Sequence, residues 1–197
     1  SYDRLPELLA VQLNDTHPIL AIPELLRLLT EDGVEWDAAL AMAKEIFSYT
    51  NHTVMAEALE EWDQSLVQTL LPRIYDIILE LDNRHNAHLR SKFNGDESKV
   101  QSCAILYYNK VRMANLSIIT SHYVNGVSAL HSDILKKSLF RDFAQVEPEK
   151  FGNVTNGIAH RRWLCQANPK LTGLITDLIG DKFITEASEL TKLNAFL

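Results

Sequence analysis

The apolar positions at the start of the chain recur mostly at helical spacing. Pro23 stands where the first turn of a helix tolerates proline, and the leucines that follow it keep the helical pattern until Asp32-Gly33. Asp37 is a suitable N-cap for a second apolar stretch over residues 38–46. The pattern therefore predicts two helices in this region, one ending at Asp32-Gly33 and one over 38–46.

Helical spacing also dominates the middle of the chain. A long tract covers residues 63–93, and Pro72 predicts a break or a kink within it, because proline removes a backbone donor and clashes with the preceding turn. Residues 111–121 and 128–139 predict two more helices, and Asn125-Gly126 predicts the turn that joins them. We therefore expect a predominantly helical chain.

Two short stretches fit strands better than helices. Residues 8–13 form a continuous apolar run, which is typical of a buried strand in a parallel sheet. Residues 47–53 alternate and contain aromatic and threonine side chains, so they predict a short strand or an extended loop. A single strand leaves backbone groups unpaired, so we expect the partners of 8–13 to lie mostly outside this sequence.

The polar, turn-rich segment 151–160 is the best candidate for a domain boundary, because helical character resumes at 161–164. The sequence shows no internal repeat, no low-complexity stretch and no Gly/Ser linker. It begins with Ser1 rather than Met and carries no leader-like segment. We therefore expect an excised segment of a longer protein.

Composition narrows the class of protein. The chain has 197 residues, 46% of them hydrophobic, which can bury one sizeable core or one core and part of another. Its net charge of −7 argues against nucleic-acid binding, which needs a basic surface. No apolar run approaches the roughly 20 residues that a membrane span needs. Cys103 and Cys165 have no metal-type spacing and predict free thiols in a reducing compartment, here the cytoplasm.

Three polar groups follow or interrupt apolar runs, at residues 12–18, 48–53 and 155–156. They gather Asp, Asn, His and Thr, which supply the short, oriented donors and acceptors typical of sugar and phosphate sites. Taken alone, each group also fits a structural role. Residues 14–18 fit a strand end and a helix cap, Asn51 to Thr53 fit a loop, and Asn156-Gly157 fits a tight turn.

Other chemistries remain open at this level. Asp15 and Glu60 are a candidate carboxylate pair for glycoside hydrolysis, although the sequence does not give their separation. A helical, metal-dependent hydrolase would use the histidines His17, His52, His122 and His131. His85 and His88 stand three positions apart on a helix, but no Asp, Glu or Cys completes a metal set, so we expect no metal site.

A series of ordered blocks carries a family resemblance. The blocks are 11–18, 21–25, 49–54, 57–60, 115–116, 121–122, 124–127, 131–132, 134–137, 140, 147–148, 150–151, 155–158 and 161–164. Together they resemble the α-glucan phosphorylases, which comprise the glycogen, starch and maltodextrin phosphorylases. The chain departs from the usual pattern at Ala56 and at Ala159-His160, where the family commonly has proline and Thr-Pro.

The resemblance implies a fold and a reaction. It implies a predominantly helical α/β fold that forms part of a GT-B arrangement of two Rossmann-like domains, with little sheet in this segment. Residues 1–157 would be the later part of the N-terminal domain, and 158–197 the crossover and first helices of the C-terminal, cofactor-binding domain. The parent enzyme would be a retaining glycosyltransferase that phosphorolyses α-1,4-glucan with inorganic phosphate to glucose 1-phosphate. Pyridoxal phosphate is the cofactor of such enzymes, which are commonly homodimers.

The resemblance also assigns roles to residues. His52 resembles the catalytic histidine that faces the glucosyl unit. The implied substrate-binding residues are Asn156, Val127, Asp15, His17 and Glu60. Trp163 matches an aromatic residue beside the cofactor. None of the ten lysines has the surroundings of the Schiff-base lysine, so we expect this segment alone to be inactive. The alternative function is a non-catalytic carbohydrate-binding or interaction module derived from the same fold.

Overall fold

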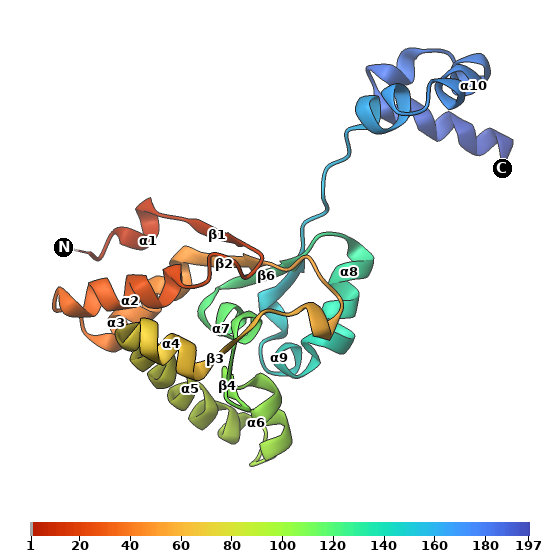
Figure 1. The fold of residues 1–197 in the computed structure, drawn as a ribbon. Coiled ribbons are helices and arrows are strands. Elements are labelled where there is room, and N and C mark those ends of the chain that lie inside the picture. The colour runs from red at the N-terminus through yellow and green to blue at the C-terminus, as the bar shows by residue number, and fades with distance from the viewer. Residues whose placement is uncertain (1) are drawn as a thin grey trace. The chain divides into compact units, whose positions relative to one another are not determined.

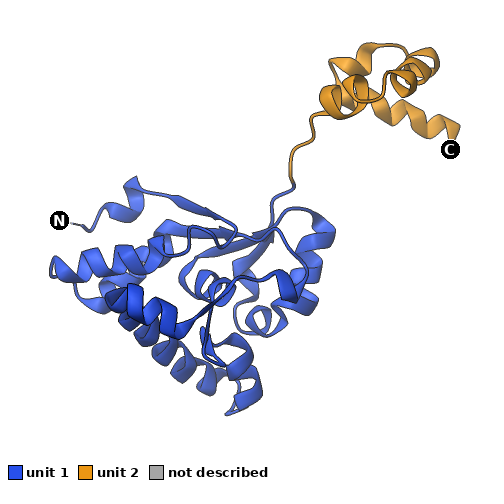
Figure 2. Ribbon diagram, viewed as in Figure 1, with its two compact units in different colours: residues 1–155 blue, residues 156–197 orange. Residues whose placement is uncertain are grey.

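The computed structural model describes residues 2–197. The chain divides into two compact units, 1–155 and 156–197 (Figure 2). Each unit is a separate body with its own internal contacts. The assignment of 1–157 and 158–197 to two domains of a GT-B enzyme stays a prediction.

A four-stranded parallel sheet forms the centre of the first unit. Its strands are β1 (Val11–Asn14), β2 (Phe47–Thr50), β6 (Tyr123–Gly126) and β7 (Phe151–Asn153), paired in that order. The sheet partners of β1 therefore come from this chain, and the expectation that they lie outside it is wrong. β1 also begins three residues later than predicted, because Leu5–Leu8 form the short helix α1 and Leu8 and Leu9 are exposed.

Helices cover this sheet and make most of the unit. They are α1 (Leu5–Leu8), α2 (Ala21–Glu31), α3 (Trp36–Ile46), α4 (Gln64–Leu70), α5 (Pro72–Lys92), α6 (Glu97–Cys103), α7 (Met113–Thr120), α8 (Ala129–Ile134) and α9 (Arg141–Val146). The short helical segments are η1 (Ala56–Ala58), η2 (Leu135–Leu139) and η3 (Pro148–Lys150). Figure 1 shows α2 and α3 beside β1 and β2, while α5 contacts α2 and α8 contacts β6 and β7. A predominantly helical α/β fold with small sheets is thus confirmed.

The hydrophobic core lies between the sheet and these helices. Leu13 and Tyr49 of the sheet are fully buried, as are Ile22 and Leu26 of α2. All eight residues of α7 are buried, and its polar side chains Asn115, Ser117 and Thr120 each donate to a backbone carbonyl oxygen. The helix break predicted at Pro72 is confirmed, because α4 ends at Leu70 and α5 begins at Pro72.

A second, antiparallel sheet joins two parts of the long connection between β2 and β6. Its strands are β3 (Glu61–Asp63), β5 (Lys110–Arg112) and β4 (Leu106–Tyr107), in that spatial order. The helix predicted over 111–121 therefore starts only at Met113, because the preceding residues pair with β3. Asp37 does not cap α3, whose N-cap is Glu35; its carboxylate instead pairs with Arg84 at 2.7 Å.

The second unit consists of short helical segments. They are η4 (Arg161–Gln166), α10 (Pro169–Ile179), η5 (Lys182–Ile184) and η6 (Ala187–Phe196). Its buried side chains include Ile175 and Phe183, and the ring of His160 lies 2.9 Å from the Phe183 carbonyl oxygen. Asn168 caps α10 by accepting the Leu171 N–H at 3.1 Å.

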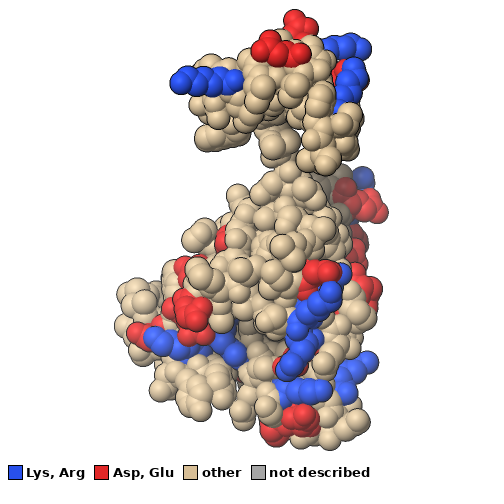
Figure 3. Space-filling model, turned by 90° about the vertical axis from the view of Figure 1, so that its right-hand side faces the viewer, with Lys and Arg blue, Asp and Glu red and all other residues tan. Residues whose placement is uncertain are grey.

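The surface charges of the described residues are mixed. Figure 3 shows one face of the chain, on which basic side chains lie next to acidic ones and much of the surface carries neither. The ion pairs between side chains are mostly exposed, and each therefore has a small stabilising effect. Among residues 2–197, no helix combines the length and the apolar character that crossing a membrane requires.

Candidate functional site

Several sequence-predicted site residues directly follow strands of the parallel sheet. Asp15 follows β1, His52 lies two residues after β2, and Val127 follows β6. Because parallel strands end at the same edge, their carboxyl ends bring these residues to one side of the sheet. In open α/β sheets this edge is the usual place for a ligand. We call it the carboxyl edge.

Asp15 ties the end of β1 to β2. Its backbone N–H donates to the Thr50 carbonyl oxygen at 2.9 Å, and its carboxylate accepts the Thr16 N–H at 2.7 Å. Its φ of 62° lies in the left-handed region, which Asp and Asn tolerate better than most residues. The chain therefore turns sharply at Asp15, directly after the end of β1.

Glu60 lies in the long connection between β2 and β6 and contacts the loop that follows β1. Its carboxylate accepts the Thr16 hydroxyl at 2.7 Å and the Trp62 indole N–H at 2.9 Å. His17 Nδ1 lies 3.7 Å from the same carboxylate, and its side chain is 80% exposed. The structure thus gathers Asp15, His17 and Glu60, with Glu60 oriented by two donors and His17 facing solvent.

A buried network fixes the loop that carries His52. Asn51 is fully buried; its amide donates to the Tyr49 hydroxyl at 2.9 Å, and its Oδ1 accepts the Thr53 N–H at 3.0 Å. His131 Nε2 lies 3.1 Å from Asn51 Oδ1 and 3.1 Å from the Thr53 carbonyl oxygen. The loop is therefore held on both sides of His52, whose imidazole stays exposed.

The same histidine, His131, holds the loop after β6. Val127 donates its backbone N–H to His131 Nδ1 at 3.1 Å. Since Nδ1 accepts this bond, the ring proton is on Nε2, which then donates to Asn51 Oδ1 and the Thr53 carbonyl oxygen. His131 itself stands in the first turn of α8, where its N–H donates to the N-cap Ser128. One neutral imidazole thus joins the loops that follow β2 and β6.

A row of polar side chains crosses the sheet just inside the carboxyl edge. Gln12 donates to the Thr50 hydroxyl at 2.6 Å, and this hydroxyl donates to Asn125 Oδ1 at 3.0 Å. Asn125 belongs to β6, so the turn predicted at Asn125-Gly126 is wrong; both residues are the end of a strand. Hydrogen bonds along this row fix the ends of three neighbouring strands.

Burial sets the charge state of the tyrosine beneath this edge. It raises the pKa of Tyr49 well above its ordinary value, and the hydrogen bond from Asn51 offsets the increase only in part. The Tyr49 hydroxyl is therefore neutral at all pH values of interest. It accepts the Asn51 amide as a fixed dipole and does not take part in proton transfer.

The two remaining predicted residues belong to the second unit. Asn156 is exposed in the segment without regular structure that precedes η4. Trp163 lies in η4 with 71% of its surface exposed. The structure places Asn156 and Trp163 relative to the other residues of the second unit.

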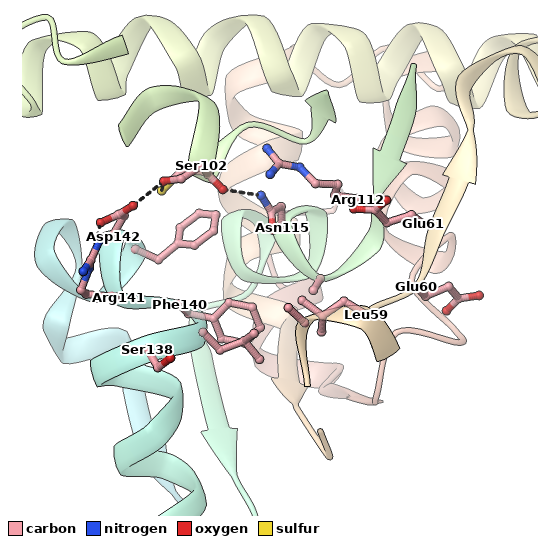
Figure 4. A pocket seen from close by; sticks show the side chains of 15 residues that line it. Leu59, Glu60, Glu61, Ser102, Arg112, Asn115, Ser138, Phe140, Arg141 and Asp142 are labelled. Carbon is pink, nitrogen blue, oxygen red and sulfur yellow. Dashed lines mark hydrogen bonds and ion pairs between the residues drawn. The ribbon is translucent and has the colours of Figure 1, made fainter. Parts of the chain in front are cut away.

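A cavity of about 240 Å³ lies beside β3, β5, α6 and η2. Leu59 and Phe140 form part of its apolar wall, and Ser102 donates to Asp142 at 2.6 Å on its polar side. Figure 4 shows the Glu60 side chain pointing away from these apolar residues. Glu60 thus borders the cavity, while its carboxylate binds Thr16 of the loop after β1 and Trp62.

Sequence reasoning missed the residues that hold the site together. The residue types alone predicted Asn51 as part of a loop and His131 as one ligand of a metal cluster. Within residues 2–197, no group of three or more His, Cys, Asp or Glu has the geometry to hold a metal ion. The one available signal for His131 was its place, with Ser132, in a block shared with the phosphorylases.

Comparison with known proteins gives a consistent result. The chain matches the family model described as carbohydrate phosphorylase over residues 1–197. It is 46% identical over 197 residues to the brain form of glycogen phosphorylase from Bos taurus and 45% identical over 196 residues to that from Homo sapiens. Each match covers 98% of this chain and 23% of the relative. The liver form from Ovis aries is 44% identical over 201 residues, covering 100% of this chain and 24% of the relative. The chain thus spans less than a quarter of the length of these curated relatives.

Proposed function

The chain belongs to the carbohydrate phosphorylase family, and from this membership we propose that its carboxyl edge forms one wall of the glucosyl site of an α-glucan phosphorylase. The parent enzyme would use inorganic phosphate to split α-1,4-glucan into glucose 1-phosphate. The first unit would be the later part of the N-terminal domain of a GT-B fold. The second unit would begin the C-terminal domain, and the parent would be a homodimer.

The observation that carries the proposal is the rigid presentation of His52. Asn51 and Thr53, on either side of it, are both bound to His131. A site that stabilises positive charge at the sugar ring needs dipoles that are oriented before the reaction, because reorienting them would add to the barrier. The His52 carbonyl oxygen and imidazole are proposed to face the glucosyl unit in this way.

The other residues have proposed roles that fit their contacts. The Val127 N–H is already donated to His131, so a backbone contact from Val127 to a sugar hydroxyl has to use its carbonyl oxygen. Glu60, held by Thr16 and Trp62, and the exposed His17 would form the polar wall of a channel together with Asp15. Asn156 is proposed to bind a glucose hydroxyl.

Pyridoxal phosphate is the proposed cofactor of the parent, but the described residues do not fit it on their own. Lys150 is the buried lysine of the first unit, and its ammonium donates to the Ile118 carbonyl oxygen and to Glu147 at 3.1 and 2.9 Å. Trp163 offers only an exposed aromatic face. The chain alone is therefore expected to form no Schiff base and to release no glucose 1-phosphate. A Schiff-base absorbance band that survives gel filtration would contradict this.

Steady-state kinetics test the proposal in a phosphorylase chain that contains this segment. His52→Ala should lower turnover on the order of 10²-fold, because it removes an oriented group at the site of charge development. Asn156→Ala should weaken sugar binding by roughly 1–3 kcal/mol. The matched control is His122→Ala, since His122 precedes the amino end of β6, at the opposite edge of the sheet. Kinetics near those of the wild type for both His52→Ala and Asn156→Ala would favour a binding module without catalysis.

A further inference from the structure

A second pocket lies away from the carboxyl edge. It has a volume of about 300 Å³ and is lined by Lys44 of α3, by Arg84, His85 and His88 of α5, and by Glu147 after α9. Apolar side chains complete its wall. His122, which precedes the amino end of β6, lies 3.0 Å from the Lys44 carbonyl oxygen, so this region is near the opposite edge of the sheet. We call it the Lys44 pocket.

Two of the charged residues that line the Lys44 pocket are already neutralised. Arg84 is paired with Glu80 and with Asp37, and its guanidinium lies over the Trp36 ring. Glu147 accepts the Lys150 ammonium at 2.9 Å. Within each pair the opposite charges compensate one another. The charge that attracts a ligand must therefore come from another residue that lines the pocket.

Lys44 and His85 supply groups that the protein leaves unused. Within residues 2–197, no hydrogen bond or ion pair holds the Lys44 ammonium, although burial is large enough to lower the pKa of Lys44. His85 Nε2 is buried and has no hydrogen-bond partner among the described residues. A buried polar atom without a partner costs folding free energy, so His85 Nε2 calls for an explanation.

Burial and nearby cations keep the His85 imidazole neutral. Burial first, and then the charges of Lys44 and Lys150 and the neighbouring His88, lower the pKa of His85 to about 3. The His85 ring stacks on Phe143, with 6.0 Å between ring centroids, which fixes its orientation. A neutral imidazole held in this way can present an N–H to a ligand, and the unpaired Lys44 ammonium favours an anion.

We propose that the Lys44 pocket binds a phosphate group, either as inorganic phosphate or as part of a small phosphate monoester. The Lys44 ammonium supplies a charge-assisted hydrogen bond, and His85 Nε2 supplies a second donor. His88 approaches from the next turn of α5. Donors that come from two helices suit a tetrahedral anion with several acceptor oxygens better than a planar carboxylate. The apolar part of the wall has room for the organic group of a monoester.

Calorimetric titration of the 197-residue chain, at constant ionic strength, tests this proposal with inorganic phosphate, phenyl phosphate and acetate as probes. We expect saturable binding of phosphate and a shift of the His85 ring resonances in the corresponding NMR titration. Tighter binding of phenyl phosphate identifies a monoester as the ligand class, and equal binding identifies the inorganic anion. Acetate binding as strong as phosphate binding, or His85 resonances that do not move, would overturn the proposal.

Three variants localise the binding. Lys44→Met and His85→Phe should each weaken phosphate binding about tenfold or more, the factor expected for loss of one charge-assisted hydrogen bond. Lys170→Met, which removes an exposed lysine of the second unit, makes the same charge change and should bind like the wild type. Lys44→Arg keeps the charge and should retain binding, which guards against a misfolded Lys44→Met. Equal affinity of Lys44→Met and Lys170→Met would overturn the proposal.

Discussion

His131 Nε2 lies 3.1 Å from Asn51 Oδ1, although the two residues are 80 positions apart in the chain. Asn51 directly follows β2, and His131 stands in the first turn of α8. Both side chains are buried, so water cannot replace the bond at low cost. This contact is the reason that the loop carrying His52 has a defined path.

The first prediction concerns this contact. His131→Phe keeps a ring of similar shape but leaves the Val127 N–H without its partner, and Asn51 Oδ1 keeps only the Thr53 N–H. Buried polar groups without partners cost roughly 1–3 kcal/mol each, so the free energy of unfolding should fall by at least that amount. Urea denaturation followed by circular dichroism measures the change.

The control for His131→Phe is His122→Phe, because His122 is exposed and makes one ring contact, at the Lys44 carbonyl oxygen. Its effect on the free energy of unfolding should stay within about 0.5 kcal/mol, as for most surface substitutions. Equal destabilisation by the two substitutions would show that the His131 network is not a special support of the fold.

The second prediction concerns the close approach of β6 and β7. A Cβ at Gly152 would lie 1.7 Å from the Tyr123 hydroxyl oxygen and 2.3 Å from its ring carbon Cζ. Gly152→Ala should therefore destabilise the first unit by about 1–3 kcal/mol, the usual cost of overpacking. Adding Tyr123→Val, which removes the ring, should recover much of the loss in a thermal melt.

Gly173→Ala is the matched control for that substitution. Gly173 lies inside α10, and no atom stands within 4 Å of the point that an added Cβ would occupy. Alanine is a better helix former than glycine by roughly 0.5–1 kcal/mol, so Gly173→Ala should be neutral or stabilising. If Gly152→Ala were equally harmless, Tyr123 would not cross over Gly152 in solution.

The third prediction concerns acid stability. The pKa of His85 is lowered to about 3 in the folded chain, chiefly by burial, from an ordinary value of 6.5. Between these two pH values the unfolded chain binds a proton that the folded chain does not. The free energy of unfolding should therefore fall as pH falls through this window, by up to about 1.4 kcal/mol per pH unit from this residue. Above pH 6.5 this contribution to stability is fully present.

His85→Phe removes the titrating ring, so unfolding measured between about pH 4 and pH 7 should depend less on pH than in the wild type. His122→Phe removes an exposed imidazole and provides the reference for loss of one histidine. If the free energy of unfolding of His85→Phe fell with pH as steeply as that of the wild type, this would contradict a buried, neutral His85.

Local patterns predicted the helices well but the sheet poorly. The break at Pro72 follows from proline's missing N–H, and β2 follows from alternation over a few residues. The pairing of β2 with β6 is different, because Thr50 meets Asn125 across a connection that contains four helices and a second sheet. No local pattern contains that information. Asn125-Gly126 has the composition of a turn, yet tertiary pairing makes it a strand end.

The candidate site divides in the same way. Polar residues after apolar runs indicated Asp15 and His52, because strand ends are where side chains leave the core. The residues that orient them were not visible in the sequence. Asn51 and His131 act together, and the sequence around each residue does not indicate the other as its partner. The orientation of Glu60 likewise depends on Thr16, which is distant from it in the sequence.

The central claim is that the carboxyl edge binds a glucosyl unit, and a sugar titration of the 197-residue chain tests it most directly. Backbone NMR resonances would be followed as maltopentaose is added, in the wild type, in His52→Ala and in His122→Ala. We predict shifts concentrated at residues 14–17, 51–53 and 127–131, which His52→Ala reduces and His122→Ala retains. Shifts confined to other parts of the chain, or shifts that His52→Ala leaves unchanged, would contradict the account.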